Sequence, residues 1–421
     1  MQRALLAAMV VAAPSTAHAF NLQTSSTGDA LRWPGGEILI EPVLAGGPPE
    51  VTDGEAVGAI QIAVASWQAA LDGAEVSIAV SGDPSGSIAT GDGINSVRWA
   101  MDEEDWGVDA GLLAKTHLSY QVADGAILEA DVVINAADFA WSTALTPEGC
   151  DVDYDLEGSI SHELGHLLGL GHSLDADATM FATGRPCETL KRELSADDAS
   201  AIEFLYRDLP PPGGIAPSPT TCAAAGGSRS PAALVVLAAL FGLVRRRRGR
   251  MRLLAASLIA LSLPGLAAAG ELRQLDLGEL GARADLVVRG VVVEVEPSPD
   301  GELATDSLVD VTECLAGDCP ETVRVRRRGG EQDGRGLRVE GEAELAAGQE
   351  VVLYLRARPD RPHTVFGGLQ GALRLVRHQG IIHAARDLRG HRVLDSGTWR
   401  HGGIELIDLD SLRRSLARGA L

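Results

Sequence analysis

Apolar residues in the first half of the chain follow two different periods. Between Thr52 and Ala70 they recur at helical spacing, which predicts an amphipathic helix. Two more helices are expected, one capped by Asp155 and running to Leu170, the other capped by Ser195 and running to Tyr206. Alternating or β-rich runs predict strands at 37–40, 76–80, 94–100, 113–120 and 127–135. This half therefore combines a sheet with helices.

The N-terminal segment, residues 1–19, has the pattern of a secretory signal. A short basic start is followed by an apolar run and by the small-residue ending Ala17-His18-Ala19. The alternative is a buried N-terminal helix, but the apolar run is too short to span a membrane. We expect cleavage after Ala19 and a secreted mature chain that begins near Phe20.

A segment rich in proline, glycine and serine follows the first half, at residues 211–230, and predicts a linker that contains Cys222. Residues 231–250 then hold an apolar run and the cluster Arg245–Arg248. Together with Cys222 they resemble the MYXO-CTERM surface-sorting tails of myxobacterial proteins, which implies membrane or cell-surface anchoring through this tail. About 14 apolar residues are few for a membrane span, and a buried core helix is the alternative.

Residues 251–269 form a second signal-like or transmembrane segment, which opens with Met251-Arg252 and ends in three alanines. Two interpretations compete. Two neighbouring secreted proteins are joined in one reading frame, or the segment and the preceding tail form a membrane hairpin with the arginines inside. We favour the joined frames. A native peptide that bridges Val244 and Leu253, detected by mass spectrometry, would exclude them.

Residues 270–421 are mostly β in pattern. Strands are expected at 286–295, 322–326, 350–355 and 372–376. The Gly329-Gly330 turn and the step from Leu369 to Gly371 resemble uncharacterised secreted β-domains. The histidines of this part share no metal-ligand spacing. The sequence predicts a second, small, mostly-β domain and assigns it no role.

Charge divides the two halves. Residues 20–210 contain 33 Asp and Glu against 7 Lys and Arg, whereas residues 271–421 contain 25 against 21. So acidic a first half excludes attraction to nucleic acid or to an anionic membrane surface, but it identifies no substrate. Neither the substrate nor the oligomeric state follows from composition.

The chain has five cysteines, and an exported protein is expected to pair them. Cys150 and Cys187 bracket a histidine-rich segment, and we predict a disulfide between them. Cys314 and Cys319 are expected to close a small loop, which leaves Cys222 unpaired. Free buried thiols are the alternative for both pairs.

The segment Ser161–Ser173 carries the chemistry, because it contains H-E-x-x-H-x-x-G-x-x-H. His162 and His166, four residues apart on a helix, can offer ring nitrogens to one ion. Glu163 is turned by about 100° around the axis and suits a base beside the metal-bound water. Gly169 lets the chain leave the helix, so that His172 becomes the third ligand. Three protein ligands leave a fourth position open, as in catalytic zinc sites.

Met180 and Ser173, with the segment Leu194–Tyr206, complete a pattern that resembles the matrixin branch of the metzincin zinc metalloproteases. The resemblance spans roughly residues 52–207. It implies zinc ligation by His162, His166 and His172, a base role for Glu163 and a supporting turn at Met180. The implied fold is an α/β (α+β) domain whose twisted, mostly parallel sheet has a long backing helix and an active-site helix below it.

Two departures from that family limit the resemblance, and a neighbouring acidic segment fails as a calcium loop. No cysteine lies between Phe20 and the first helix, so latency through a thiol ligand is not expected. His117 is the only other histidine of the mature domain, which gives no second zinc site. Asp151–Asp155 resembles a calcium loop, but Leu156 and His162 occupy its glycine and glutamate positions. Another calcium geometry stays open as an alternative.

The predicted function is a zinc-dependent metalloendopeptidase that hydrolyses extracellular proteins or peptides with water activated by Glu163. An edge strand at 112–117 is the expected substrate-binding strand. The alternative is a surface-anchored binding or adhesion protein in which zinc is structural. The expected organisation is a signal at 1–19, a catalytic domain at 20–210, a linker at 211–230, a tail at 231–250, a signal-like segment at 251–269 and a β-rich domain at 270–421.

Overall fold

The computed structural model describes residues 19–82, 86–107, 111–144, 153–209, 275–358, 361–378, 381–387, 392–395, 398–401 and 404–419. The predicted signal (except Ala19), linker, tail and second signal-like segment lie outside the described residues. The described parts of both halves belong to one compact unit. No helix within these described ranges is long and apolar enough to cross a membrane.

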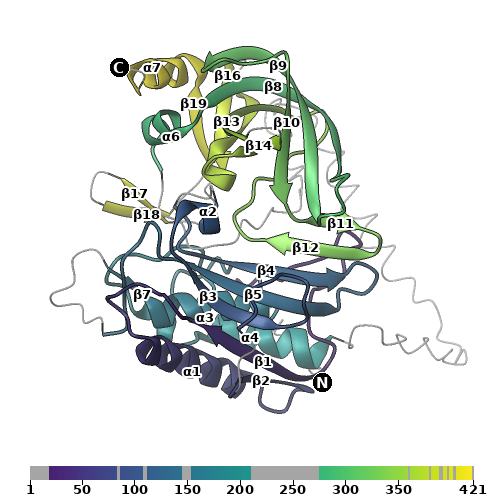
Figure 1. Ribbon diagram of the computed structural model, residues 1–421, viewed down its shortest axis with the longest axis vertical. Coiled ribbons are helices and arrows are strands. Elements are labelled where there is room, and N and C mark those ends of the chain that lie inside the picture. Colours follow the sequence, from purple (N-terminus) through teal and green to yellow (C-terminus); the bar gives the residue numbers. More distant parts are fainter. Residues whose placement is uncertain are drawn as a thin grey trace, which may run out of the picture. The chain divides into compact units, whose positions relative to one another are not determined.

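The first half contributes five strands to one sheet (Figure 1). Strand β1 pairs in parallel with β2 and β3, β3 pairs in parallel with β5, and β4 pairs antiparallel with β5. The predicted α/β class and the mostly parallel pairing are confirmed for these strands. Their bounds are β1 Gly36–Val43, β2 Val76–Val80, β3 Asn95–Ala100, β4 Ala114–Gln121 and β5 Ile127–Asn135.

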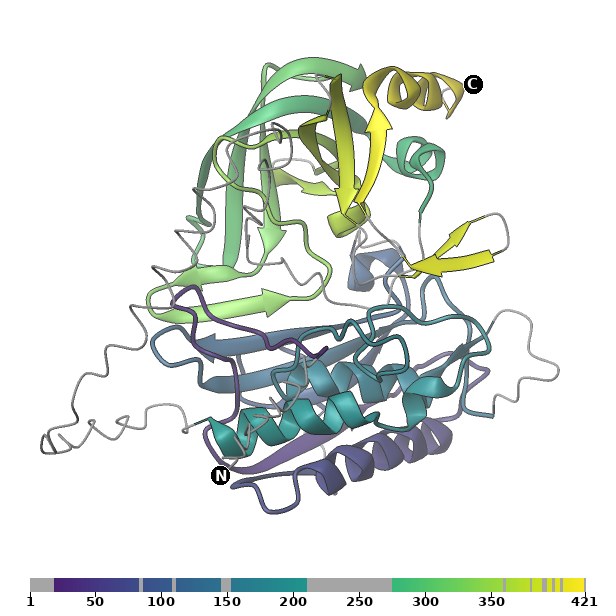
Figure 2. The same ribbon diagram turned by 180° about the vertical axis from the view of Figure 1, so that it is seen from behind.

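Helices α1 and α3 cover one face of this sheet (Figures 1 and 2). Helix α1, Asp53–Ala70, buries an apolar stripe that includes Trp67. The Trp67 Nε1 donates a hydrogen bond to the Ser161 carbonyl at 2.8 Å, which fixes α1 against the middle of α3. The other elements of this half are α2 Glu103–Trp106, β6 Trp141–Ser142, β7 Tyr154–Asp155, α3 Leu156–Leu167, η1 Leu190–Arg192, α4 Ala196–Glu203 and the π-turn η2 Phe204–Asp208.

A capping box begins α1. The Glu55 amide donates to Thr52 Oγ1 at 3.3 Å, and the Thr52 amide donates to Glu55 Oε2 at 2.9 Å. Replacing Thr52 by alanine is expected to lower the free energy of unfolding by about 1 kcal/mol, because amides of the first turn lose their partner. Gln61→Ala, on the exposed face of the same helix, is the matched control. Urea unfolding measures both, and equal stabilities would contradict a role for the cap.

Two helix ends differ from the prediction. Helix α3 stops at Leu167, three residues before the predicted Leu170, because Gly169 adopts φ +95° and cannot continue a right-handed helix. Helix α4 stops at Glu203 and continues as a π-turn to Asp208, so the predicted end at Tyr206 was wrong. Both differences concern the last turn, where sequence patterns are least informative.

The second half forms its own sheet, with the order β14-β10-β9-β8-β13-β15-β16-β19. Its pairings are antiparallel except that of β10 with β14, which is parallel, and β14 makes an additional antiparallel pairing with β13. All four β-type runs predicted here lie within strands. The elements are α6 Leu277–Arg283, β8 Leu286–Pro297, β9 Ala304–Ala316, β10 Thr322–Arg328, β11 Gly330–Gln332, β12 Arg335–Val339, β13 Glu350–Arg358, β14 Arg361–Val365, η3 Gly368–Gly371, β15 Ala372–His378, β16 Ile381–Asp387, β17 Arg392–Asp395, β18 Thr398–His401, β19 Ile404–Asp408 and α7 Leu409–Gly419.

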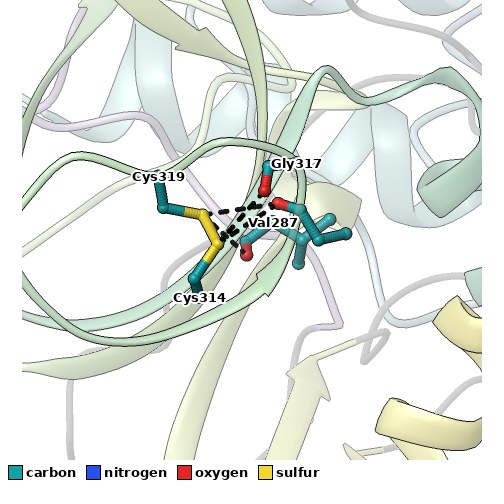
Figure 3. Close-up of a disulfide and its surroundings, with 5 residues drawn as sticks. Val287, Cys314, Gly317 and Cys319 are labelled. Atoms are coloured by element: carbon teal, nitrogen blue, oxygen red, sulfur yellow. Dashed lines mark hydrogen bonds between the residues drawn. A yellow bond between two sulfur atoms is a disulfide. The ribbon is translucent and has the colours of Figure 1, made fainter.

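Cys314 and Cys319 form a disulfide at the end of β9, as predicted (Figure 3). Cys187 is also disulfide-bonded, whereas Cys150, its predicted partner, and Cys222 lie outside the described residues. The pairing of Cys150 with Cys187 therefore stays a prediction.

The hairpin of β11 and β12 does not stay with the second sheet. Strand β12 pairs antiparallel with β4, so the first sheet has the order β11-β12-β4-β5-β3-β1-β2. Strand β4 was expected to be an open edge. It is the outermost strand contributed by the first half, but the hairpin covers it.

Candidate metal centre

Three imidazole rings converge at the end of α3. The Nε2 atoms of His162 and His166 lie 3.1 Å apart, and each lies 3.2 Å from His172 Nε2. Nitrogen ligands on a tetrahedral zinc ion, with bonds of about 2.0–2.1 Å, lie about 3.3 Å from one another. The predicted ligands are therefore brought together at the spacing that one zinc ion requires.

In two of the rings the other nitrogen, Nδ1, makes a hydrogen bond that directs the Nε2 lone pair toward the centre of the triad. His162 Nδ1 donates to the Thr179 carbonyl at 2.7 Å, and His166 Nδ1 donates to the Leu170 carbonyl at 2.8 Å. Burial lowers the pKa of His166 to about 4 and holds the pKa of His162 well below its usual value. Both imidazoles are thus neutral, with Nε2 left to bind a metal.

The turn after α3 positions the third histidine. The Gly169 amide bonds to the His166 carbonyl and the Leu170 amide to the Gly165 carbonyl, at 2.9 and 3.0 Å, which is a Schellman motif. A Cβ on Gly169 would lie 2.0 Å from the Leu31 carbonyl oxygen. The Asn21 side chain then donates to the His172 carbonyl at 2.8 Å. Both the turn and this bond direct His172 back toward the helix.

Met180 lies against α3, and Ser173 directly follows His172 in the chain. A Cβ on Gly165 would come within 2.1 Å of Met180 Sδ, so the helix and the methionine are in close contact. The Ser173 amide donates to the Met180 carbonyl at 2.8 Å, and Ser173 Oγ donates to Asp197 Oδ2 at 2.7 Å. Met180 thus packs against α3 and is bonded to Ser173, while the supporting role of both residues stays a prediction.

Sequence reasoning did not assign Asp198 a role. Its buried carboxylate accepts the Thr179 and Met180 amides at 2.8 and 3.0 Å, which holds the turn that carries Met180. A signal was present, because Asp198 is the fourth residue of the capping box that begins at Ser195. The capping-box pattern predicted where the helix starts, but it did not indicate that Asp198 also binds the turn that carries Met180.

Two further neighbours of the centre went unpredicted. Thr116 Oγ1, on β4, donates to Glu163 Oε2 at 2.6 Å. Lys191 is buried, with Nζ 3.2 Å from His162 Nδ1 and bonded to the Phe181 carbonyl. Nothing local in the sequence indicates either contact, since both arise where separate elements pack together.

The remaining metal candidates are placed elsewhere. Within the described ranges, the histidine triad is the one group of three or more His, Cys, Asp or Glu positioned to hold an ion. His117 lies in β4, with Nδ1 3.5 Å from Thr90 Oγ1. Asp155 caps α3 and forms an ion pair with Arg192 at 2.6 Å, while residues 151–152 lie outside the described part.

Residues 68–207 match the Matrixin family model. This matrixin segment contains the whole histidine triad and Glu163. The chain is 41% identical over 66 residues to Metalloendoproteinase 4-MMP of Arabidopsis thaliana, which covers 16% of this chain and 19% of that relative. Metalloendoproteinase 1 of Glycine max is 49% identical over 53 residues, covering 13% and 17%. Matrilysin of Homo sapiens is 37% identical over 59 residues, covering 14% and 22%.

The chain thus spans about a fifth of the length of these curated relatives. Matrixins use zinc, so the predicted cofactor agrees both with the matrixin segment and with the geometry of the triad. The match to the family model ends at residue 207 and so concerns the first half of the chain.

Proposed function

We propose that this chain is a zinc-dependent metalloendopeptidase. The observation that carries the proposal is the convergence of three histidine Nε2 atoms within 3.2 Å of one another, next to Glu163 in the matrixin segment. A purely structural zinc site needs a fourth protein ligand. Among the described residues the triad offers three, which favours the enzyme over the alternative of an adhesion protein with structural zinc.

The chemistry that zinc supplies when bound is Lewis acidity, which lowers the pKa of a water molecule to about 7. Glu163 takes a proton from the attacking water, whose oxygen bonds to the peptide carbonyl carbon; the C–N bond then breaks, and Glu163 gives the proton to the leaving amine. The Thr116 hydroxyl, which donates to Glu163 Oε2, orients the carboxylate during both transfers. The chain therefore contributes a positioned base, Glu163, and the three histidines that would bind the metal.

Substrates are extracellular proteins or peptides, bound in extended form. Strand β4 passes beside Glu163, so a peptide paired with its main chain would have its carbonyls presented at the centre. Such main-chain recognition is broad in sequence. Secretion through residues 1–19 and anchoring through the tail at 231–250 complete the proposal and rest on sequence pattern.

Metal analysis and chelation test this function. We expect one zinc per chain, and we expect a chelator to abolish hydrolysis of a quenched-fluorescent peptide library and zinc to restore it. Removing an ion present at about 1,000 times its Kd should also lower the free energy of unfolding by about 4 kcal/mol. Hydrolysis that survives full removal of zinc would exclude the proposal.

A further inference from the structure

Part of the second half occupies the strand that a substrate would need. In the pairing of β12 with β4, Arg335 lies opposite Gln121 and Val339 lies opposite His117. The next amide, of Glu340, donates to the Thr116 carbonyl at 3.4 Å. This pairing overlaps the expected substrate strand, 112–117, at Thr116 and His117, so an extended peptide paired along that strand would compete with the segment for these main-chain groups.

The occupying segment also reaches the metal centre. Glu340 Oε1 accepts from Gln23 Nε2 at 2.7 Å, and the same Nε2 lies 3.4 Å from His166 Nδ1. Burial raises the pKa of Glu340 to about 8, so at lower pH its carboxyl brings no charge into the site. His162, Glu163 and His166 are each 0% exposed in the complete unit. A substrate can therefore reach these side chains only when the structure around them opens, which limits the rate of the complete chain.

Two glycines allow this close fit. A Cβ on Gly336 would lie 2.2 Å from the Tyr120 ring, and a Cβ on Gly341 would lie 2.3 Å from Leu112 Cδ1. Gly341 also has φ +78°, which ends the extended conformation directly after Glu340. Residues 335–340 therefore run along β4 toward Glu163, and the chain turns away from β4 at Gly341.

Polar contacts surround the paired strands. Glu331 accepts from the Ser26 amide at 2.8 Å and from the Tyr120 hydroxyl at 2.9 Å. Arg338 donates to the Thr24 carbonyl at 2.9 Å. Arginines of the second half meet an acidic first half, as in the Arg356–Glu103 ion pair at 3.1 Å. Charge complementarity of this kind favours association and fixes its register.

An apolar contact anchors the far end of the segment. Leu369 packs against a cluster on the first half that consists of Ala100, Trp106, Leu112 and Val133. The Leu369 amide donates to the Gly341 carbonyl at 2.8 Å, which ties this contact to the glycine turn. The hairpin, the turn and Leu369 thus form one continuous surface against the metal-binding half.

We propose that, in a product that keeps both halves in one chain, residues 275–419 inhibit the peptidase by holding residues 335–341 along β4. This inference rests on the proposed function. Such inhibition would keep the enzyme latent without a cysteine ligand, because residues 335–341 block main-chain binding of a substrate and cover the histidine triad. The partner that fits β4 is therefore a segment of this chain, and a peptide substrate competes with it.

Two variants of the full chain test the inhibition. Gly336→Trp puts a large side chain where a Cβ already meets the Tyr120 ring, and Leu369→Asp puts a carboxylate into the apolar cluster. Each should raise kcat/KM for a quenched-fluorescent peptide at least about tenfold with unchanged zinc content. Hydrogen exchange of the β4 amides should rise in parallel. The two changes lie on different elements, so misfolding of one leaves the other informative.

Leu406→Asp is the matched control, because Leu406 is 40% exposed on β19 and should leave the rate at the wild-type value. Rates within about twofold of wild type, in variants whose β4 amides have become exchangeable, would overturn inhibition while the peptidase stands. Absence of zinc-dependent cleavage in every variant, with β4 exposed and zinc bound, would overturn the proposed function and with it this inference.

Discussion

Glu163→Gln is expected to lower kcat/KM by about 10²–10⁴-fold, the range that a positioned general base contributes. An amide of the same size still accepts the Thr116 hydroxyl bond, but it cannot take a proton from water. The zinc content should stay at the wild-type value, because the three histidines that bind the metal are untouched. The rate is best measured with Leu369→Asp present, so that inhibition does not mask it.

Glu203→Gln provides the control for this variant. Glu203 lies at the end of α4, is exposed and pairs only weakly with Arg207 at 3.6 Å, so its loss should not change the rate. A Glu163→Gln protein that cleaves as fast as this control would refute the base role. Loss of zinc from Glu163→Gln would instead show that the carboxylate helps to hold the metal.

Gly169→Ala should be the most damaging change outside the ligands. The alanine would have to adopt φ +95° with its Cβ 2.0 Å from the Leu31 carbonyl oxygen. Strain at a positive φ and a backbone displacement together should cost about 2–4 kcal/mol of unfolding free energy. Zinc affinity should fall as well, because the displaced turn carries His172.

Gly58→Ala is the matched control for this second change. Gly58 lies within α1 without a positive φ, and a Cβ added there would have no atom within 4 Å, so alanine should stabilise the helix by about 0.5–1 kcal/mol. Urea unfolding and competition with a zinc-binding dye measure the two effects. Equal free energies of unfolding for the two variants would show that the turn at Gly169 accommodates alanine without strain, which would contradict the prediction.

Local geometry explains what could be predicted from the sequence. His162 and His166 are one helical turn apart, so their common face follows from spacing without knowledge of the fold. The bounds of β2 and β5 were predicted to the residue, because their apolar runs are bounded by clear turn residues. The end of α3 was missed since the leucines before Gly169 favour a longer helix than the turn allows.

Tertiary packing explains what could not be predicted. Thr116 reaches Glu163 from a strand, and Asp198 reaches the Met180 turn from another helix, so neither contact has a periodic signal. Strand β12 pairs with a strand that lies far earlier in the chain. Alternation of side chains shows that a segment is extended, but it does not name the neighbour with which that segment pairs.

When β12 and β4 belong to one chain, their pairing does not depend on the protein concentration. About 65 residues separate Leu209 from Leu275, and a covalent connection makes the pairing of the blocking strand with β4 an intramolecular event. Latency is then independent of dilution while the chain is intact. A single cut between the two halves would make the block a bimolecular equilibrium, so that dilution would release β4 and raise the rate.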